Sequence, residues 1–336
     1  MKKALIILAL LAIAIWLVIL PGLVGLYIKR SLPAWLDESG PLSLTEQRSG
    51  WFSSSLKLDG PDWQLSARAR HVPPTQAAWL ELAGQLQPAW LEQPLDFDGA
   101  LGLSGNSQLQ LNTDRLATRT EPAIAAGASD LILQQSAPGQ VEAHLALAAL
   151  SLEDTLGNRL MPGDSRLTLN WHRIDPAHSS LHLNMKLDES PSKLMLRVEP
   201  IAIEPARELI QGIEQLQQAR PETIDQQMAL LTIAGAWQQL AEAGLVIELG
   251  ELSLDAETRL AGRWVTADGL PVVQGAGQLE TLLDWAASLI GLSRGISPEM
   301  AEREARGWLT SLVDAEWLKP EGERFEFSFP PENSGD

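Results

Sequence analysis

The feature that most constrains this chain is an uncharged apolar run over residues 4–28. Two lysines precede the run, and Lys29 and Arg30 follow it. A helix rises about 1.5 Å per residue, so a run of this length crosses the roughly 30 Å hydrocarbon core of a bilayer. The sequence therefore predicts a short cytoplasmic tip and a transmembrane anchor within residues 1–30. Representative anchor positions are Leu5, Ile13, Trp16, Val18, Leu23 and Tyr27.

A cleaved secretory signal peptide is the main alternative, because it also begins with a short basic region. Its apolar segment is usually about 7–15 residues long and ends at a small-residue site. The run here is longer, and residues 22–25 match such a site poorly, so an uncleaved single-pass anchor is favoured. A short tail ahead of a long domain is typical of a signal anchor. We therefore expect the N-terminus in the cytoplasm and residues 31–329 in the periplasm of a bacterium, held at the inner membrane.

Charge and cysteine content exclude several classes of function for the outer part. The chain has 25 basic and 43 acidic residues, and four of the basic ones lie in residues 1–30, which contain no acid. The remainder carries a net charge of −22, which repels nucleic acid and anionic head groups. No cysteine is present, so disulfides, thiolate metal sites and cysteine nucleophiles are absent. We expect no nucleic-acid partner and no cofactor.

Alternation of apolar and polar residues predicts a large antiparallel sheet. It begins near residue 42 and is clearest over residues 165–199, where Leu167, Leu169 and Trp171 alternate with polar residues. Turn signals separate such runs by about a dozen residues, which favours a meander over βαβ units. Helical spacing replaces it at about 205–244, and residues 245–329 mix both patterns. The predicted class is α+β: an anchor helix, a mostly antiparallel sheet and several covering helices in the C-terminal half, with a disordered tail at 330–336.

A short motif soon after the anchor resembles the Arg-Gly-Trp-Phe-Ser-Ser signature of the YdgA-like family of bacterial envelope proteins. It consists of Arg48, Gly50, Trp51, Phe52, Ser53 and Ser54, with Ser49 separating the arginine from the glycine. The resemblance implies an inner-membrane-anchored, β-rich protein of unknown activity. More distantly, the anchor followed by amphipathic sheets resembles the AsmA-like proteins, which are implicated in moving or organising envelope lipids.

Read as chemistry alone, the motif favours structure over catalysis. Gly50 permits a bulge, and the residues after it are expected to start a strand with Trp51 and Phe52 on opposite faces. Serine catalysis needs a positioned base, and no G-x-S-x-G motif occurs.

His178 and His182 have the spacing of a helical zinc site, but they lie in a strand pattern and are interpreted as surface residues. No catalytic, cofactor-binding or metal-binding residue is therefore assigned.

Twelve tryptophans against one tyrosine suggest a second use for the apolar surface. Core packing is the simpler interpretation, and the alternative is that some rings line a groove for acyl chains. A sheet with one apolar face must cover it with helices, another sheet or a ligand. We expect a non-enzymatic envelope protein that binds a lipid or hydrophobic ligand, or scaffolds envelope assembly. An acidic module that docks a basic protein partner is the alternative, and a hydrolase is a third hypothesis.

Overall fold

A computed structural model describes residues 43–50, 52–60, 63–71, 80–102, 106–187, 192–218 and 223–330. The chain divides into two compact units, residues 1–150 and residues 151–336. The predicted anchor, with its six representative positions, and residues 331–336 lie outside the described residues. Among the helices that are described, none combines the length and the apolar character needed to cross a membrane.

The first unit is an antiparallel meander in the parts of it that are described. Its long strands pair in the order β1, β2, β3, β4, β5, β6, β9 and β10, and a short β7–β8 pair lies between β6 and β9 in the sequence. The strands are β1 (Ser43–Ser49), β2 (Ser53–Asp59), β3 (Trp63–His71), β4 (Leu80–Pro88), β5 (Leu95–Leu101), β6 (Ser107–Thr113), β7 (Leu116–Ala117), β8 (Ala123–Ala126), β9 (Ser129–Ala137) and β10 (Gln140–Glu153). Strand β10 runs past the boundary between the units.

Register keeps the leucines of the first unit on one face of its sheet. Leu58 lies opposite Leu65, which lies opposite Leu86, which in turn lies opposite Leu95. Because side chains alternate with a period of two, the intervening polar residues share the other face. The alternation read from the sequence is therefore confirmed as an amphipathic sheet.

The second unit continues the same design with a second series of antiparallel strands. Their pairing order is β11, β12, β13, β14, β15, β16, β18 and β17. The strands are β11 (Arg159–Arg173), β12 (His178–Leu187), β13 (Lys193–Ala202), β14 (Val246–Ser253), β15 (Arg259–Val265), β16 (Val272–Gln278), β17 (Leu318–Glu321) and β18 (Arg324–Phe329). A large antiparallel sheet with helices confirms the α+β class.

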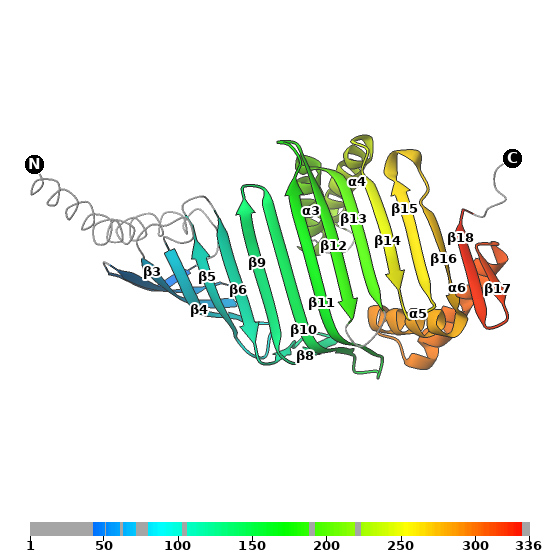
Figure 1. The fold of residues 1–336 in the computed structure, drawn as a ribbon, viewed down its shortest axis with the longest axis horizontal. Coiled ribbons are helices and arrows are strands. Elements are labelled where there is room, and N and C mark those ends of the chain that lie inside the picture. The colour runs from blue at the N-terminus through cyan, green and yellow to red at the C-terminus, as the bar shows by residue number, and fades with distance from the viewer. Residues whose placement is uncertain are drawn as a thin grey trace, which may run out of the picture. The chain divides into compact units, whose positions relative to one another are not determined.

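Four described helices accompany this second sheet in two pairs. They are α3 (Ile203–Gln218), α4 (Ile224–Glu242), α5 (Leu279–Arg294) and α6 (Pro298–Asp314). Figure 1 shows α3 and α4 near one end of strands β11–β14, and α5 and α6 near the other end of the neighbouring strands. Helix α6 begins as the sequence predicts, with Ser297 at the N-cap and Pro298 in the first turn.

Each helix pair closes its own apolar cluster against the sheet. Ile201, Ala202, Leu240 and Leu245 form the buried cluster beneath α3 and α4, with Trp171 and Trp237 packed against it. The cluster beneath α5 and α6 is larger and contains Leu282, Leu309, Leu318 and Phe325. The core of the second unit therefore lies on the apolar face of the sheet, at two separate places.

One detail of the expected fold requires correction, and three others could not be read from the sequence pattern. Phe52 was expected in a strand, but it lies in a bend and is half exposed, between Arg48 on β1 and the start of β2 at Ser53. Strand β14 ends at Ser253, because Asp255 turns the chain by accepting bonds from the next amides. Helix α4 starts at Ile224, after Thr223 at the N-cap. Strand β17 was not predicted, because its sequence shows no clear alternation of apolar and polar residues.

Candidate functional site

Three rows of aligned apolar residues run across the second sheet. The first row lies beneath α3 and α4: Trp171, Leu181, Val198, Ile247 and Trp264. The second row is Leu169, Leu183, Leu196, Leu249 and Gly262. The third row is Leu167, Met185, Leu194, Leu252 and Leu260. Side chains directly opposite each other on an antiparallel pair stand about 4.5–5.5 Å apart at Cβ, so each row is continuous.

The second row and most of the third are not fully buried. Every leucine of the second row, and Leu167, Met185, Leu194 and Leu252 of the third, remains partly exposed. Only Leu260 of these two rows is packed against a described buried cluster. A band of partly exposed aliphatic surface, packed on neither buried cluster except at Leu260, therefore lies between the two helix pairs.

A hollow of about 390 Å³ lies where this band meets α5. Its sheet side includes Met185, Leu194 and Leu252, and its helix side includes Trp285 and Leu289. A second hollow of about 400 Å³ lies along the same helix, between Leu260 on β15 and Trp308 on α6. The two hollows share Trp285 and Leu289. Together they form what we call the α5 trough.

The volume and lining of the α5 trough fit an apolar ligand. Binding sites for small molecules are commonly 300–1,000 Å³ and mostly apolar, with a few polar groups. The polar side chains here lie at the margins: Arg294 and Glu304 beside Trp308, and Lys193 beside the sheet. Arg294 Nη1 lies 2.6 Å from Glu304 Oε2, and Lys193 pairs with Glu251. The trough thus offers a hydrocarbon environment with the Arg294–Glu304 ion pair at one margin.

The Lys193 ammonium also sets the charge state of its partner. Hydrogen bonding from Lys193, then from Ser253, holds the pKa of Glu251 below its usual value, against a smaller opposing effect of burial. Glu251 therefore stays ionised at neutral pH. Because both side chains remain partly exposed to solvent, the contribution of the pair to stability is small.

Helix α5 is fixed at its start by a carboxylate from the β14–β15 turn. Asp255 Oδ2 accepts a hydrogen bond of 2.6 Å from Thr281 in the first turn of α5. Its Oδ1 accepts from the amides of Glu257 and Thr258. Burial raises the pKa of Asp255, but these bonds, led by that from Thr281, outweigh burial and leave the pKa below its usual value.

The far end of α5 is fixed by Asn158. Its Nδ2 donates to Asp154 Oδ2 and to the Ile296 carbonyl, both at 2.6 Å. Gly291 on α5 lies so close that a Cβ there would stand 2.1 Å from Asn158 Oδ1. Burial raises the pKa of Asp154, while bonds from Asn158, Leu156 and Gly157 lower it further than burial raises it. With both ends held, α5 forms a fixed wall and the trough is preformed.

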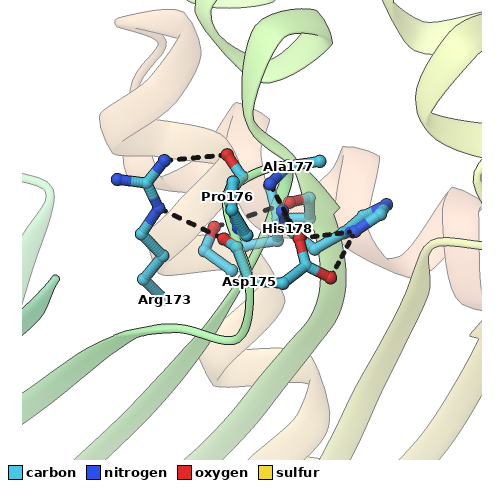
Figure 2. A network of polar contacts seen from close by, with 7 residues as sticks. Arg173, Asp175, Pro176, Ala177 and His178 are labelled. Atoms are coloured by element: carbon cyan, nitrogen blue, oxygen red, sulfur yellow. Dashed lines mark hydrogen bonds and ion pairs between the residues drawn. The ribbon is translucent and has the colours of Figure 1, made fainter.

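A second polar cluster lies in the β11–β12 turn (Figure 2). Asp175 Oδ1 accepts bonds from the amides of Ala177 and His178, at 2.7 and 2.8 Å, and Asp175 Oδ2 lies 3.0 Å from His178 Nδ1. Arg173 donates to the carbonyls of Asp175 and Pro176. The bond with His178 is the largest of the effects that lower the pKa of Asp175. Each of these contacts closes the turn.

The histidines are used as local hydrogen-bonding residues. His178 pairs with Asp175, and His182 Nε2 lies 3.6 Å from Glu199 Oε2. Across the described parts of the chain, no three histidine or acidic side chains gather in a way that could hold a metal ion. The i, i+4 spacing of His178 and His182 thus falls within β12 and does not form a helical site.

One serine–histidine contact does occur, in the family-like motif. Ser54 Oγ and His71 Nε2 share a hydrogen bond of 3.2 Å, and each residue is only 3% exposed. Ser54 faces Ala69 across the β2–β3 pair, and neither partner lines a hollow described for the first unit. The pair joins β2 to the end of β3, and both side chains are buried. Sequence reasoning missed this contact because the register of β2 on β3 was unknown.

The rest of the motif surrounds the β1–β2 turn. The Gly50 amide donates to the Ser53 carbonyl at 2.7 Å, and the His71 amide donates to the Phe52 carbonyl at 2.8 Å. Arg48 lies 2.9 Å from Glu46 on the same strand, and Trp51 lies outside the described residues. These contacts stabilise the β1–β2 hairpin and join it to the end of β3.

The tryptophans divide between core and groove. Trp171 and Trp237 pack on the α3–α4 cluster, and the Trp237 and Trp264 rings lie 5.4 Å apart. Trp285 lines the α5 trough, while Trp308 at its margin is half exposed. Trp90 is also half exposed, so core packing does not account for every tryptophan.

Comparisons with family models, characterised proteins and solved structures give no significant match for this chain.

Proposed function

We propose that this chain is a non-enzymatic protein of the bacterial inner membrane that binds a lipid or another hydrophobic ligand in the α5 trough. The observation that carries the proposal is the open aliphatic band between the helix pairs, which leads into hollows of about 390 and 400 Å³. Covering this band with a hydrocarbon chain removes apolar surface from water, worth about 25 cal/mol per Å². Scaffolding of envelope assembly would use the same anchored domain.

The location rests on the sequence. The uncharged run over residues 4–28 supports a single-pass anchor with the N-terminus in the cytoplasm and the β-rich part in the periplasm. The motif around Gly50 resembles that of the YdgA-like envelope proteins and supports the same compartment. An anchored domain meets lipid at high local concentration, which suits a trough that binds acyl chains.

The alternative is an acidic interaction module that docks a basic envelope partner. A net charge of −22 outside residues 1–30 supports it. Salt separates the two proposals, because screening weakens attraction between exposed charges and leaves hydrophobic burial intact. Capture of a basic protein that falls steeply with salt, without any lipid, would favour the alternative.

The proposal is tested with a photoreactive fatty acid that carries a diazirine. The full-length protein in phospholipid vesicles is irradiated with this probe, digested and analysed by mass spectrometry. We expect adducts on peptides of β12–β14 and α5, in addition to adducts on the anchor. Adducts confined to residues 4–28 would show that the trough does not bind the probe and would overturn the proposal.

Two residues of β13 give a matched pair of variants. Leu194 points into the trough, whereas Met195 is exposed on the opposite face of the same strand. Leu194→Glu should abolish the trough adducts, and Met195→Glu should leave them unchanged. Leu289→Glu tests the same wall from a partly exposed position on α5, so that loss of labelling can be separated from loss of folding. Equal labelling of all three variants would contradict the assignment.

A further inference from the structure

One margin of the α5 trough is formed by an ion pair between α5 and α6. Arg294 is the last residue of α5, and Glu304 lies in the middle of α6. Arg294 Nη1 and Glu304 Oε2 are 2.6 Å apart. Both residues line the hollow of about 400 Å³, and among the described charged residues of these two helices they are the only ones that do. One cation and one anion therefore lie together at the edge of an apolar hollow.

Trp308 completes this margin. It follows Glu304 by four residues on α6, and residues four apart share one face of a helix. Trp308 lines the same hollow and is half exposed. An indole ring is favoured where one side is apolar and the other is in contact with water, and its face attracts an ammonium group. The margin is thus a boundary between the hydrocarbon interior of the trough and water.

The ion pair is exposed enough to exchange partners. The side chains of Arg294 and Glu304 are 64 and 40% exposed. A pair this accessible contributes little to stability, because water screens it. A ligand that carries both charges can replace this one pair with two. A guanidinium binds a phosphate through two parallel hydrogen bonds, and a primary ammonium donates up to three hydrogen bonds to oxygen acceptors.

A head group with only one sign of charge fits this margin less well. An anionic head group would bind Arg294, but it would place a second anion beside the Glu304 carboxylate, which loses its partner. A purely cationic head group would leave Arg294 in the corresponding position. Specificity commonly combines such a repulsive contact with an attractive one. The margin therefore favours a ligand in which an anion and an ammonium group occur together.

We propose that the α5 trough selects lipids with a zwitterionic phospholipid head group, whose phosphate binds Arg294 and whose ammonium binds Glu304 beside Trp308. This inference rests on the proposed function, because it names the head group of the ligand whose hydrocarbon lies in the trough. The acyl part lies against Trp285 and Leu289, which the two hollows share. The head group stays at the exposed margin, where its charges keep contact with water and avoid the cost of burial.

Two photoreactive phospholipids that differ only in the head group test this inference. Both carry the same diazirine-bearing acyl chain, with phosphoethanolamine in one and phosphoglycerol in the other. The full-length protein is irradiated with each probe in micelles of an uncharged detergent, so that no other charged head group competes. The yield of adducts on peptides of α5 and α6 is divided by the yield on residues 4–28, which reports the local probe concentration. We expect this ratio to be about fivefold higher for phosphoethanolamine, because an exposed charge pair contributes up to about 1 kcal/mol.

Three variants assign the preference to the margin. Glu304→Gln removes the partner of the ammonium and should bring the two ratios together. Arg294→Gln removes the partner of the phosphate and should lower the ratio for both probes. Glu302→Gln is the matched control and should keep the preference, because Glu302 pairs with Arg306 on α6 and lies outside the lining of the hollow. None of the three substituted side chains is buried, and unchanged circular dichroism would verify the fold.

Failure of this inference can be told from failure of the proposed function. Adducts on α5 and α6 in equal yield from both probes would overturn the head-group selection and leave hydrophobic binding in place. Adducts on residues 4–28 alone, with either probe, would overturn both. Loss of the preference in Glu302→Gln as well as in Glu304→Gln would assign it to overall charge and overturn the role of the Arg294–Glu304 pair.

Discussion

The two helix pairs of the second unit cover the same face of one sheet. They differ in the contacts that hold them to the sheet and in the side chains on their outer faces. The α5–α6 pair combines an apolar cluster with polar bonds at both ends of α5, through Asp255 and Asn158. The α3–α4 pair sits on a smaller buried cluster around Leu240. Ion pairs such as Glu302–Arg306 mark the outer face of α6, whereas α4 presents Ile224 and its apolar neighbours to solvent.

One sheet thus supports a helix pair that is held by polar bonds and a second pair that exposes apolar side chains. Buried hydrogen-bonding networks specify a single arrangement, because each bond lost leaves a buried polar group unpaired. Apolar contacts are non-directional and set position less sharply. The α5–α6 pair is therefore positioned by directional bonds as well as by packing, whereas the described contacts of the α3–α4 pair with the sheet are mainly apolar.

Two helix glycines should respond oppositely to the same substitution, with the largest effect expected at Gly291. Gly291→Ala drives a methyl group into Asn158 and disrupts its bonds, so we expect a loss of about 1–3 kcal/mol in the free energy of unfolding. Gly235→Ala on α4 meets no atom within 4 Å and should stabilise by about 0.5–1 kcal/mol. Chemical denaturation measures both. Changes of equal sign would contradict the different attachments.

Acid should loosen the α5–α6 pair before the α3–α4 pair. Asp154 and Asp255 both have a pKa below the usual value. Their stabilising effect is thus fully present above the unfolded-state pKa of about 3.9 and is lost as the pH falls through the lower folded-state value. Hydrogen exchange at about pH 5 and pH 3, corrected for intrinsic rates, should show protection falling first in α5.

An asparagine at one of these positions provides the control for the acid effect. Asp255→Asn removes the titrating group while retaining one acceptor oxygen for Thr281. The variant should lose protection in α5 at neutral pH and show a weaker further loss in acid. A pH response identical to that of the unmodified chain would assign the acid sensitivity to other groups.

The outer faces should give the smallest effects on stability. Arg306→Ala removes an i, i+4 ion pair of 2.6 Å with Glu302, at a cost of about 0.3–0.5 kcal/mol. Leu231→Gln changes an exposed side chain and should stay within about 0.5 kcal/mol. Thermal unfolding at low and high salt distinguishes the two, because only the first is screened. A large loss at Leu231 would mean that the residue supports the fold.

Much of this fold is predictable because two local signals agree with its tertiary structure. Period-two leucines forced β11–β13 into an amphipathic meander, and capping by Ser297 with Pro298 placed the start of α6. The Phe52 ring suggested a strand, whereas the antiparallel pairing of β1 with β2 places Phe52 in the connection between them. Short β17 depends on pairing with β18, which no local pattern reports.

The sequence predicts an apolar face that needs a cover, but it does not predict where on the sheet the trough lies. An apolar face that needs a cover follows from alternation alone, and the sequence shows helices that can provide one. Which leucines remain partly exposed depends on the position of α5. That position depends on the hydrogen bond from Asn158 to the Ile296 carbonyl, 138 residues away. Likewise, the roles of Trp285 and Trp308 follow from the spacing of α5 and α6 on the sheet.

The two leucine-rich rows, the second and the third, have a consequence for selectivity. Successive rows present nearly the same aliphatic chemistry, and side chains on one face repeat every two residues along each strand. A flexible hydrocarbon chain lying on them meets almost equal free energies at neighbouring positions, so no single register is preferred. Such a floor tolerates ligands of different length and branching, and permits them to slide. Discrimination is then left to groups at the margins, such as Arg294 with Glu304.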